Sequence, residues 1–250
     1  MRGGPERTGL WSSSVTVGRI VIDPVDVLLD LAAAERALWS WWAGRLGAPA
    51  EEAVAAAQEA PLPDVVRRLR ERAGSGAEGR GPSGGPDEVS EVRARREQLH
   101  RLVRRRRGAS SLLRSIPSGR VAVWTTLSAD ELAFVESRAR LTLPPARLCG
   151  LAVTDDARAT AFLTDQGDEP SRWLALESHA AGAARSERLG CRVVLVRPEA
   201  KPGRPGAAQD DGTRGPDLLT AEDPALLSVT PSADGLTVGV RRQARLRPGA

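Results

Sequence analysis

Apolar residues recur with two different periods in the first fifth of the chain, and each period predicts one kind of element. Residues 19–23 form a short β-branched run after a glycine, which is typical of a buried strand. Beyond Asp26 the apolar spacing becomes helical, and its positions are Leu28, Leu31, Leu38, Trp42 and Leu46. Gly47 is placed to end this helix. The pattern therefore predicts a strand followed at once by a helix.

Helical spacing continues to about residue 115, with one low-complexity interruption. We predict further helices over residues 50–58, 64–72, 88–107 and 110–115. Residues 74–86 (GSGAEGRGPSGGP) are rich in glycine and serine and predict a flexible loop. The 88–107 helix is strongly basic, and we expect a solvated face with His100 at the surface.

From residue 121 onward, short apolar runs alternate with amphipathic stretches. The runs predict strands over residues 121–124, 148–153, 173–176 and 192–196, and the stretches predict helices over 129–140 and 180–189. Two last strands, 226–229 and 236–240, are expected to extend or edge the sheet, after a polar loop over 198–216. This alternation predicts an α/β protein with a three-layer, Rossmann-like core and a mainly parallel sheet.

About ninety residues separate the first two predicted strands, which is far more than a simple crossover of a dozen or so residues needs. We therefore predict an inserted helical cap over the carboxyl ends of the strands, where such sheets bind ligands. The expected division is a tail over 1–18, a core over 19–31 and 117–240, a cap over 32–116 with a flexible loop at 73–87, and a tail over 241–250.

Composition narrows the class of protein further. The 250 residues are 41% hydrophobic and 27% charged, which excludes wholesale disorder. No stretch approaches the roughly 18 apolar residues of a membrane span, and we expect no secretion signal. The two cysteines, Cys149 and Cys191, suit a reducing compartment, so the expected location is the cytoplasm. Lys201 is the single lysine, so a mechanism that needs a lysine in the core has no candidate.

Polar residues follow the predicted strands at their carboxyl ends. They are Asp23, Asp26, Thr125, Thr126, Asp155, Asp156 and Glu177. Carboxylates that converge at such an edge can hold a hard divalent cation or attack a phosphorus centre. For any single residue, a solvated loop or a helix cap is the alternative interpretation.

The order of elements and three segments resemble the haloacid dehalogenase (HAD) superfamily, especially its capped sugar-phosphate phosphatases. In the segment VIDPVDVLLD over residues 21–30, Asp23 falls on the family's nucleophile. In VAVWTT, Thr125 falls on the phosphate-contacting position. In WLALESHAAG, Glu177 falls on the first metal-binding acid, and Gly182 follows at family spacing. The resemblance covers about residues 19–240 and implies a phosphate-ester hydrolase fold.

The departures from the family pattern change the expected function. Val25 stands where the family has an acid/base aspartate, and a valine transfers no proton. The family's lysine corresponds to about Ala161, where Arg158 offers the nearest positive charge. Ser178 replaces the second metal-binding acid. The resemblance thus implies a phosphatase-like, degenerate member whose phosphoester hydrolase activity is weak or lost.

The residues implied for the site are Asp23 and Thr125 for catalysis, Asp23 and Glu177 for a metal, and Thr125 and Thr126 for substrate. Magnesium is the implied cofactor if the site is active, and a cofactor-free protein is the alternative. The expected ligand is a small phosphorylated metabolite, and we expect neither a membrane nor nucleic acid as partner.

Two other functions remain open at this stage. One is an active hydrolase that uses Asp23 as nucleophile with a rearranged acid/base such as Asp26 or His179. The other is a non-catalytic interaction protein whose arginine-rich segment, residues 104–107, meets an acidic partner or nucleic acid.

Overall fold

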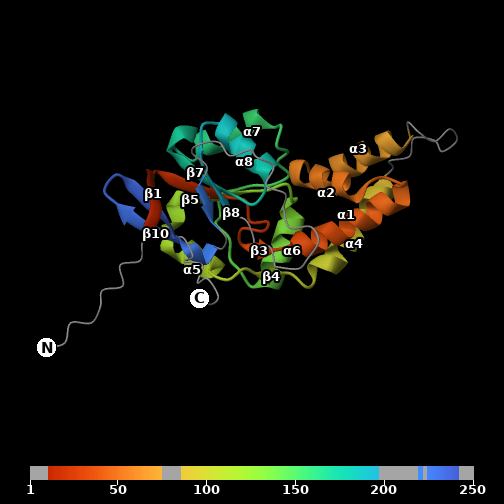
Figure 1. Cartoon of the computed structure of the whole chain (residues 1–250), viewed down its shortest axis with the longest axis horizontal. Helices are drawn as coiled ribbons and strands as arrows, with labels where there is room; N and C mark the ends of the chain where they lie inside the picture. Colours follow the sequence, from red (N-terminus) through yellow and green to blue (C-terminus); the bar gives the residue numbers. More distant parts are fainter. Residues whose placement is uncertain (1–10, 75–85, 197–218, 222–223, 242–250) are drawn as a thin grey trace, which may run out of the picture.

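The computed structural model describes residues 11–74, 86–196, 219–221 and 224–241 (Figure 1). Its centre is a six-stranded, all-parallel sheet with the order β6-β5-β2-β7-β8-β9. The strands are β2 (Arg19–Ile22), β5 (Val121–Trp124), β6 (Arg147–Leu148), β7 (Trp173–Glu177), β8 (Arg192–Val196) and β9 (Leu219–Ala221). Strands β2, β5 and β7 are almost wholly buried, as continuous apolar runs in a parallel sheet require.

Alternate residues of each strand pack into two separate cores on opposite faces of the sheet. In β2, Ile20 and Ile22 join the core beneath helices α5 (Ala109–Ser115) and α6 (Ala129–Ala139). Val21 joins the other core, beneath α7 (Asp156–Asp165) and α8 (Ala180–Arg188). This two-residue period confirms the predicted three-layer α/β fold with a parallel sheet.

A second sheet has three antiparallel strands in the order β1-β11-β10. Its strands are β1 (Trp11–Val17), β10 (Leu227–Ser232) and β11 (Gly235–Arg241). Residues 11–17, expected in a tail, thus form a strand. The last two strands were expected in the main sheet but build this one, because their alternating pattern suits a sheet with a single apolar face. That face packs on the main core.

Four helices form a block between the first and second strands of the main sheet. They are α1 (Ala32–Leu46), α2 (Ala50–Glu59), α3 (Leu62–Gly74) and α4 (Pro86–His100). They gather at one end of the molecule, with β1 and β10 at the other (Figure 1). Their own apolar core includes Leu38, Trp39, Trp42, Val66 and Val92. The boundaries of a cap domain at 32–116 stay a prediction.

Several predicted elements differ in extent from those observed. The basic helix ends at His100 rather than 107, because Arg104–Arg105 form β4 and pair with β3 (Leu29–Asp30). The strand expected over 148–153 is reduced to β6, and the following segment contains an unpredicted helix, α7. Most of the predicted loops at 73–87 and 198–216 lie outside the described residues. No described helix has the length and apolar character to cross a membrane.

Candidate functional site

A cavity of about 90 Å³ lies where the carboxyl ends of β2, β5 and β7 face helices α1 and α2. Its lining includes Asp23, Val25, Asp26, Thr126, Ser178 and His179 from the sheet side, and Glu35, Arg36 and Arg96 from the helices. Asp23 directly follows β2, and its N–H donates to the carbonyl of Leu176 at 3.0 Å, which fixes it beside β7. The edge predicted from strand order is therefore the edge that carries a cavity.

Asp23 meets a histidine supplied by the next strand. His179 Nε2 lies 3.3 Å from Asp23 Oδ2, and both side chains are largely buried. The other ring nitrogen, Nδ1, accepts the backbone N–H of Gly182 at 3.0 Å and so caps helix α8. Because Nδ1 accepts this hydrogen bond through its lone pair, Nε2 carries the ring hydrogen of the neutral imidazole and presents it to Asp23.

Burial and charge act in opposite directions on His179. Burial lowers its pKa, and the contact with Asp23 together with the charges of Asp23 and Glu177 raises it by more, so the net shift is upward. The imidazole thus provides a hydrogen-bond donor, and on protonation a positive charge, beside Asp23.

Glu177 lies behind the cavity and is fully buried. Its Oε1 accepts three hydrogen bonds, from Trp124 Nε1 at 3.0 Å, Arg185 at 3.2 Å and Ser186 Oγ at 2.8 Å. Its Oε2 has no hydrogen-bond partner among the described residues. Burial raises the pKa of Glu177, Arg185 lowers it and Asp23 raises it, with an upward net shift.

Arg185 stands over the indole ring of Trp124, with its guanidinium carbon 4.3 Å from the ring centre. Its side chain is only 4% exposed and forms the ion pair with Glu177. Position 182 has no room for a side chain, because a Cβ there would clash with Glu177 Oε2. The carboxylate is therefore held in place by hydrogen bonds from Arg185, Trp124 and Ser186, and Gly182 leaves room for it.

Asp26 lies beside Asp23 in the cavity lining and adopts a left-handed backbone conformation with φ of 58°. Its Oδ1 accepts the N–H groups of Leu31 and Ala32 at 2.9 and 2.8 Å, at the start of α1. Burial raises its pKa to about 6, although these two hydrogen bonds act against the shift. Asp26 is thus a cap for α1 and also a carboxyl group that titrates near neutrality.

The two predicted substrate threonines lie in different environments. Thr125 is buried, and its Oγ1 accepts the N–H of Leu127 at 3.2 Å, so it is not part of the cavity lining. Thr126 follows β5 and lies in the lining, together with Ser178 and His179, which follow β7 on the other side of β2. Asp155 and Asp156 pair with Arg158 and Arg188 instead and lie outside the lining.

The helical side of the cavity contains a buried ionic network that the sequence analysis missed. Arg96 donates to both oxygens of Glu35 at 2.8 Å and to Glu131 of α6 at 3.1 Å. His100 Nε2 lies 2.6 Å from Glu35 Oε1, so the expectation of a surface His100 is wrong. Arg96 lowers the pKa of Glu35 well below its usual range, against the effect of burial.

Two sequence signals point to this network. Arg96 and His100 follow Val92 at steps of four residues, so they share the buried face of α4 with it. Ser128 and Glu131 form a capping box at the start of α6, which places Glu131 near the cavity. We missed the spacing of Arg96 and His100 because we expected the basic helix to have a solvated face.

Comparisons with known proteins rest on structure alone. No protein-family model matches the sequence, and no curated protein matches it. The structure is similar to β-phosphoglucomutase from Clostridium difficile, with TM-score 0.59, 14% identity, and coverage of 72% of this chain and 84% of that one. It is also similar to a HAD family hydrolase from Deinococcus radiodurans with bound phosphate and sodium. For this pair the TM-score is 0.53, the sequence identity is 17%, and the match covers 83% of this chain and 92% of that one. A 2-haloacid dehalogenase from Pseudomonas syringae gives TM-score 0.51, 18% identity, and 84% and 95% coverage.

These findings define a class of protein: a parallel α/β protein with a helical insertion after the first strand of its main sheet and a small cavity between the two parts. Hydrolases and a phosphomutase share this architecture. The chain has the HAD fold, as the sequence motifs predicted.

The fold family implies a magnesium ion, and the donor set provides a test of that implication. Asp23, Glu177 and His179 each offer one ligand atom, and these atoms lie within 4.8 Å of one another. Magnesium prefers oxygen ligands over imidazole. Here the imidazole presents an N–H rather than a lone pair, Arg185 pairs with Glu177 at Oε1 and leaves only Oε2 without a partner among the described residues, and Ser178 supplies a hydroxyl in place of a second acid. The residues therefore do not fit a family-type magnesium site.

Proposed function

We propose that this protein is a phosphatase-like member of the HAD superfamily in which phosphoester hydrolase activity is weak or lost. The observation that carries the proposal is the immediate surroundings of Asp23. Val25 lines the cavity at the acid/base position, and its backbone N–H donates to Asp23 Oδ1 at 3.0 Å. A leaving group near Asp23 would find no aspartate at that position to protonate it, and such proton transfer contributes roughly 10²–10⁴ in rate.

The lack of a lysine beside Asp23 among the described residues supports the same proposal. Lys201, the single lysine, lies outside the described residues. The nearest replacement by sequence, Arg158, donates to the carbonyls of Gly150 and Cys149 and pairs with Asp155, and it does not line the cavity. A phosphoryl group bound near Asp23 would thus lack the compact cation that the family places there.

Asp23 and Glu177 each lie beside a basic side chain of the protein. His179 faces Asp23 and Arg185 pairs with Glu177. We infer that these two side chains replace part of the neutralisation that a metal would give in an active relative. No catalytic step is assigned to magnesium on this donor set.

One observation favours the alternative of a working hydrolase. Asp26 lines the same cavity as Asp23, and its pKa of about 6 is close to the value that suits a general acid/base at neutral pH. In this second candidate, Asp23 attacks phosphorus and Asp26 handles the proton. The capping bonds to Leu31 and Ala32 occupy only Oδ1 of Asp26.

The two candidates differ in a measurable rate. The test is turnover of p-nitrophenyl phosphate with added magnesium by the wild-type protein and by Asp23→Asn and Asp26→Asn variants, with the exposed Glu51→Gln as control. We expect all four proteins to stay at the background rate. Turnover that disappears in Asp23→Asn and persists in Glu51→Gln would overturn the proposal, and its loss in Asp26→Asn would assign the acid/base.

A small phosphorylated metabolite is the ligand we propose for the cavity, with Thr126 and the exposed Arg36 as contacts. A cytoplasmic location is part of the same proposal. Isothermal titration of the wild-type protein and the Arg36→Ser variant with inorganic phosphate tests the ligand class. Binding that is equal in both proteins would remove Arg36 from the proposed site.

A further inference from the structure

The chain segment between the helical block and the second strand of the main sheet is unusually one-sided in charge. Residues 98–129 contain seven arginines and no aspartate or glutamate. The arginines are Arg101, Arg104, Arg105, Arg106, Arg107, Arg114 and Arg120. No part of the proposed phosphatase site uses this charge, except that Arg106 donates to the carbonyl of Asp26.

The structure folds this segment into a surface hollow of about 370 Å³. Its lining combines four arginines with two hydroxyls, from residues Arg105, Arg106, Arg107, Gly108, Ser110, Ser111 and Arg114. Arg105 and Arg114 reach Ser110 and Ser111 only at 3.4 Å, and both guanidinium groups are exposed. We name this feature the arginine hollow.

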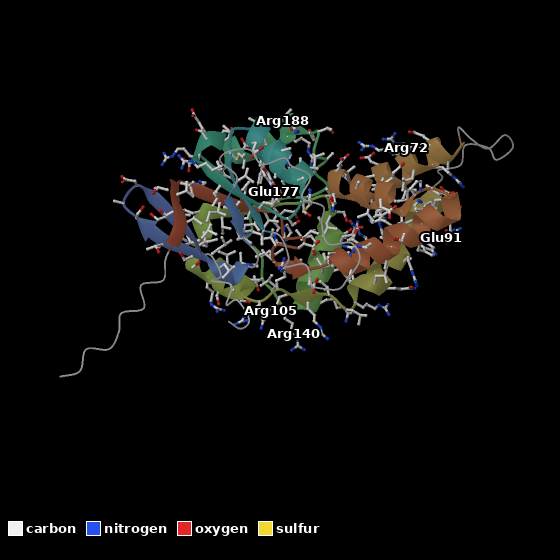
Figure 2. All side chains as sticks on the ribbon, viewed as in Figure 1. Arg72, Glu91, Arg105, Arg140, Glu177 and Arg188 are labelled. Atoms are coloured by element: carbon white, nitrogen blue, oxygen red, sulfur yellow. The ribbon has the colours of Figure 1, made fainter. Side chains whose placement is uncertain are left out.

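The surface around the arginine hollow is also basic. Strand β4 contacts helix α6, whose last turn carries Arg138 and ends at Arg140. Figure 2 shows Arg105 and Arg140 extending from the same side of the molecule, away from the ribbon. The nearest acid by strand pairing is Asp30, which lies opposite Arg104 in the β3–β4 ladder. Helix α6 also carries three acids, of which Glu131 pairs with Arg96 and Glu136 with Arg147. The arginines of this region therefore still outnumber Asp30 and Asp130.

Leu102 adds an apolar element to the same surface. Its side chain is 82% exposed and is the one large apolar side chain exposed to this degree among the described residues. It lies two residues before β4, with Arg101 and Arg104 close by in sequence. An isolated exposed leucine is ordinary, but here it marks an apolar contact point inside a basic surface.

We propose that the arginine hollow and Leu102 form a docking surface for an acidic peptide segment of a protein partner that carries an apolar side chain. Guanidinium groups bind carboxylates with two parallel hydrogen bonds, so the three exposed arginines of the hollow, Arg105, Arg107 and Arg114, match a run of glutamates or aspartates. Single-stranded nucleic acid fits less well, since base stacking needs aromatic side chains and the surface named here has none. Leu102 gives a peptide a contact that a phosphate backbone cannot use.

The experiment measures binding of two fluorescent twelve-residue probes to the full chain at low salt. One probe alternates glutamate with leucine, and the other contains glutamate and glycine. The test variant is Arg105→Ser with Arg107→Ser, and the control of equal charge is Arg93→Ser with Arg192→Ser, which changes two exposed arginines elsewhere. We expect the test variant to bind the leucine probe about tenfold more weakly, and the control to bind it nearly as wild type does.

A further variant separates apolar docking from charge alone. Leu102→Ser should weaken the leucine probe and leave the glycine probe unchanged. Equal losses in the test and control variants, or an absence of binding at low salt, would overturn the proposal. A single-stranded oligonucleotide that displaces the leucine probe more efficiently than unlabelled peptide does would overturn it in favour of nucleic acid.

Discussion

His179 has two contacts that are separable by substitution. Its Nδ1 caps α8 by accepting from Gly182, and its Nε2 faces Asp23. The cap holds the imidazole in place, so its Nε2–H stays directed at the Asp23 carboxylate. The side chain of residue 179 thus links the stability of α8 to the electrostatics of the candidate site.

Substitution of His179 can remove one contact or both. His179→Asn keeps an acceptor for Gly182 and loses the imidazole, whereas His179→Ala loses both. We expect the alanine variant to lose about 1 kcal/mol more free energy of unfolding than the asparagine variant, because a side-chain cap contributes that much. Urea unfolding followed by circular dichroism measures the difference. Equal losses in the two variants would mean that the cap contributes nothing.

Asp26 gives a pH dependence whose sign follows from its raised pKa. Its pKa is about 6 in the folded protein and 3.8 without the fold. The folded state therefore binds the proton more tightly, and this stabilisation is complete below pH 4 and is lost as the pH rises through 6. The shift corresponds to about 3 kcal/mol.

Asp26→Asn keeps the capping acceptor and tolerates the left-handed conformation, but it cannot ionise. We expect this variant to be more stable than wild type at pH 7, by up to about 3 kcal/mol, and equal to it near pH 4. Thermal unfolding at a series of pH values measures both. A constant difference across that range would contradict the assignment of the titration to Asp26.

Helices α1, α4 and α6 meet at the Glu35–Arg96–Glu131 network, which connects the helical block to the main sheet layer. Glu35 belongs to α1, Arg96 to α4 and Glu131 to α6. A second connection is the hydrogen bond from the N–H of Val153 to the carbonyl of Glu59 at the end of α2, at 2.7 Å. The block is thus fixed on two sides of the cavity, so we expect it to move little relative to the sheet.

Arg96→Met tests the network. The variant leaves Glu35 and Glu131 without their buried cation, so we expect a loss of about 3–5 kcal/mol in the free energy of unfolding. Arg67→Ala is the matched control, because Arg67 pairs with Asp64 and Glu71 on an exposed helix face and should cost at most about 1 kcal/mol. Similar losses in urea unfolding would show that burial adds nothing to the ion pair.

The strand ends were predictable because each buried strand is a local apolar run with a polar residue after it. That rule alone predicted Asp23, Thr125, Thr126 and Glu177, and the structure brings their strands together. The same rule also predicted Asp155 and Asp156, which lie outside the cavity lining. Arg96 and Glu35 are 61 residues apart, and only helix packing joins them. The two-residue strand β4 could not be predicted for a related reason. It forms only by pairing with β3, about 75 residues earlier in the chain, and two residues are too few to show an apolar pattern.

The hairpin of β10 and β11 depends on a glycine beside the first strand. Gly235 has φ of 148°, and a Cβ there would lie 2.2 Å from the carbonyl oxygen of Val17. We expect Gly235→Ala to lower the free energy of unfolding by about 2 kcal/mol or more. Gly119→Ala, where a Cβ meets no atom within 4 Å, should change it by less than about 0.5 kcal/mol. Differential scanning calorimetry compares them, and equal midpoints would contradict the predicted clash.

The pairing of β1 with β11 also constrains when the molecule can fold during synthesis. Residues 11–17 find their partners only at residues 235–241, so the three-stranded sheet cannot close until residue 241 has left the ribosome. Until then the apolar side chains of Val15 and Val17 lack their cover. A nascent chain of this protein therefore offers chaperones a binding segment at residues 11–17 for as long as the residues up to 241 are being translated.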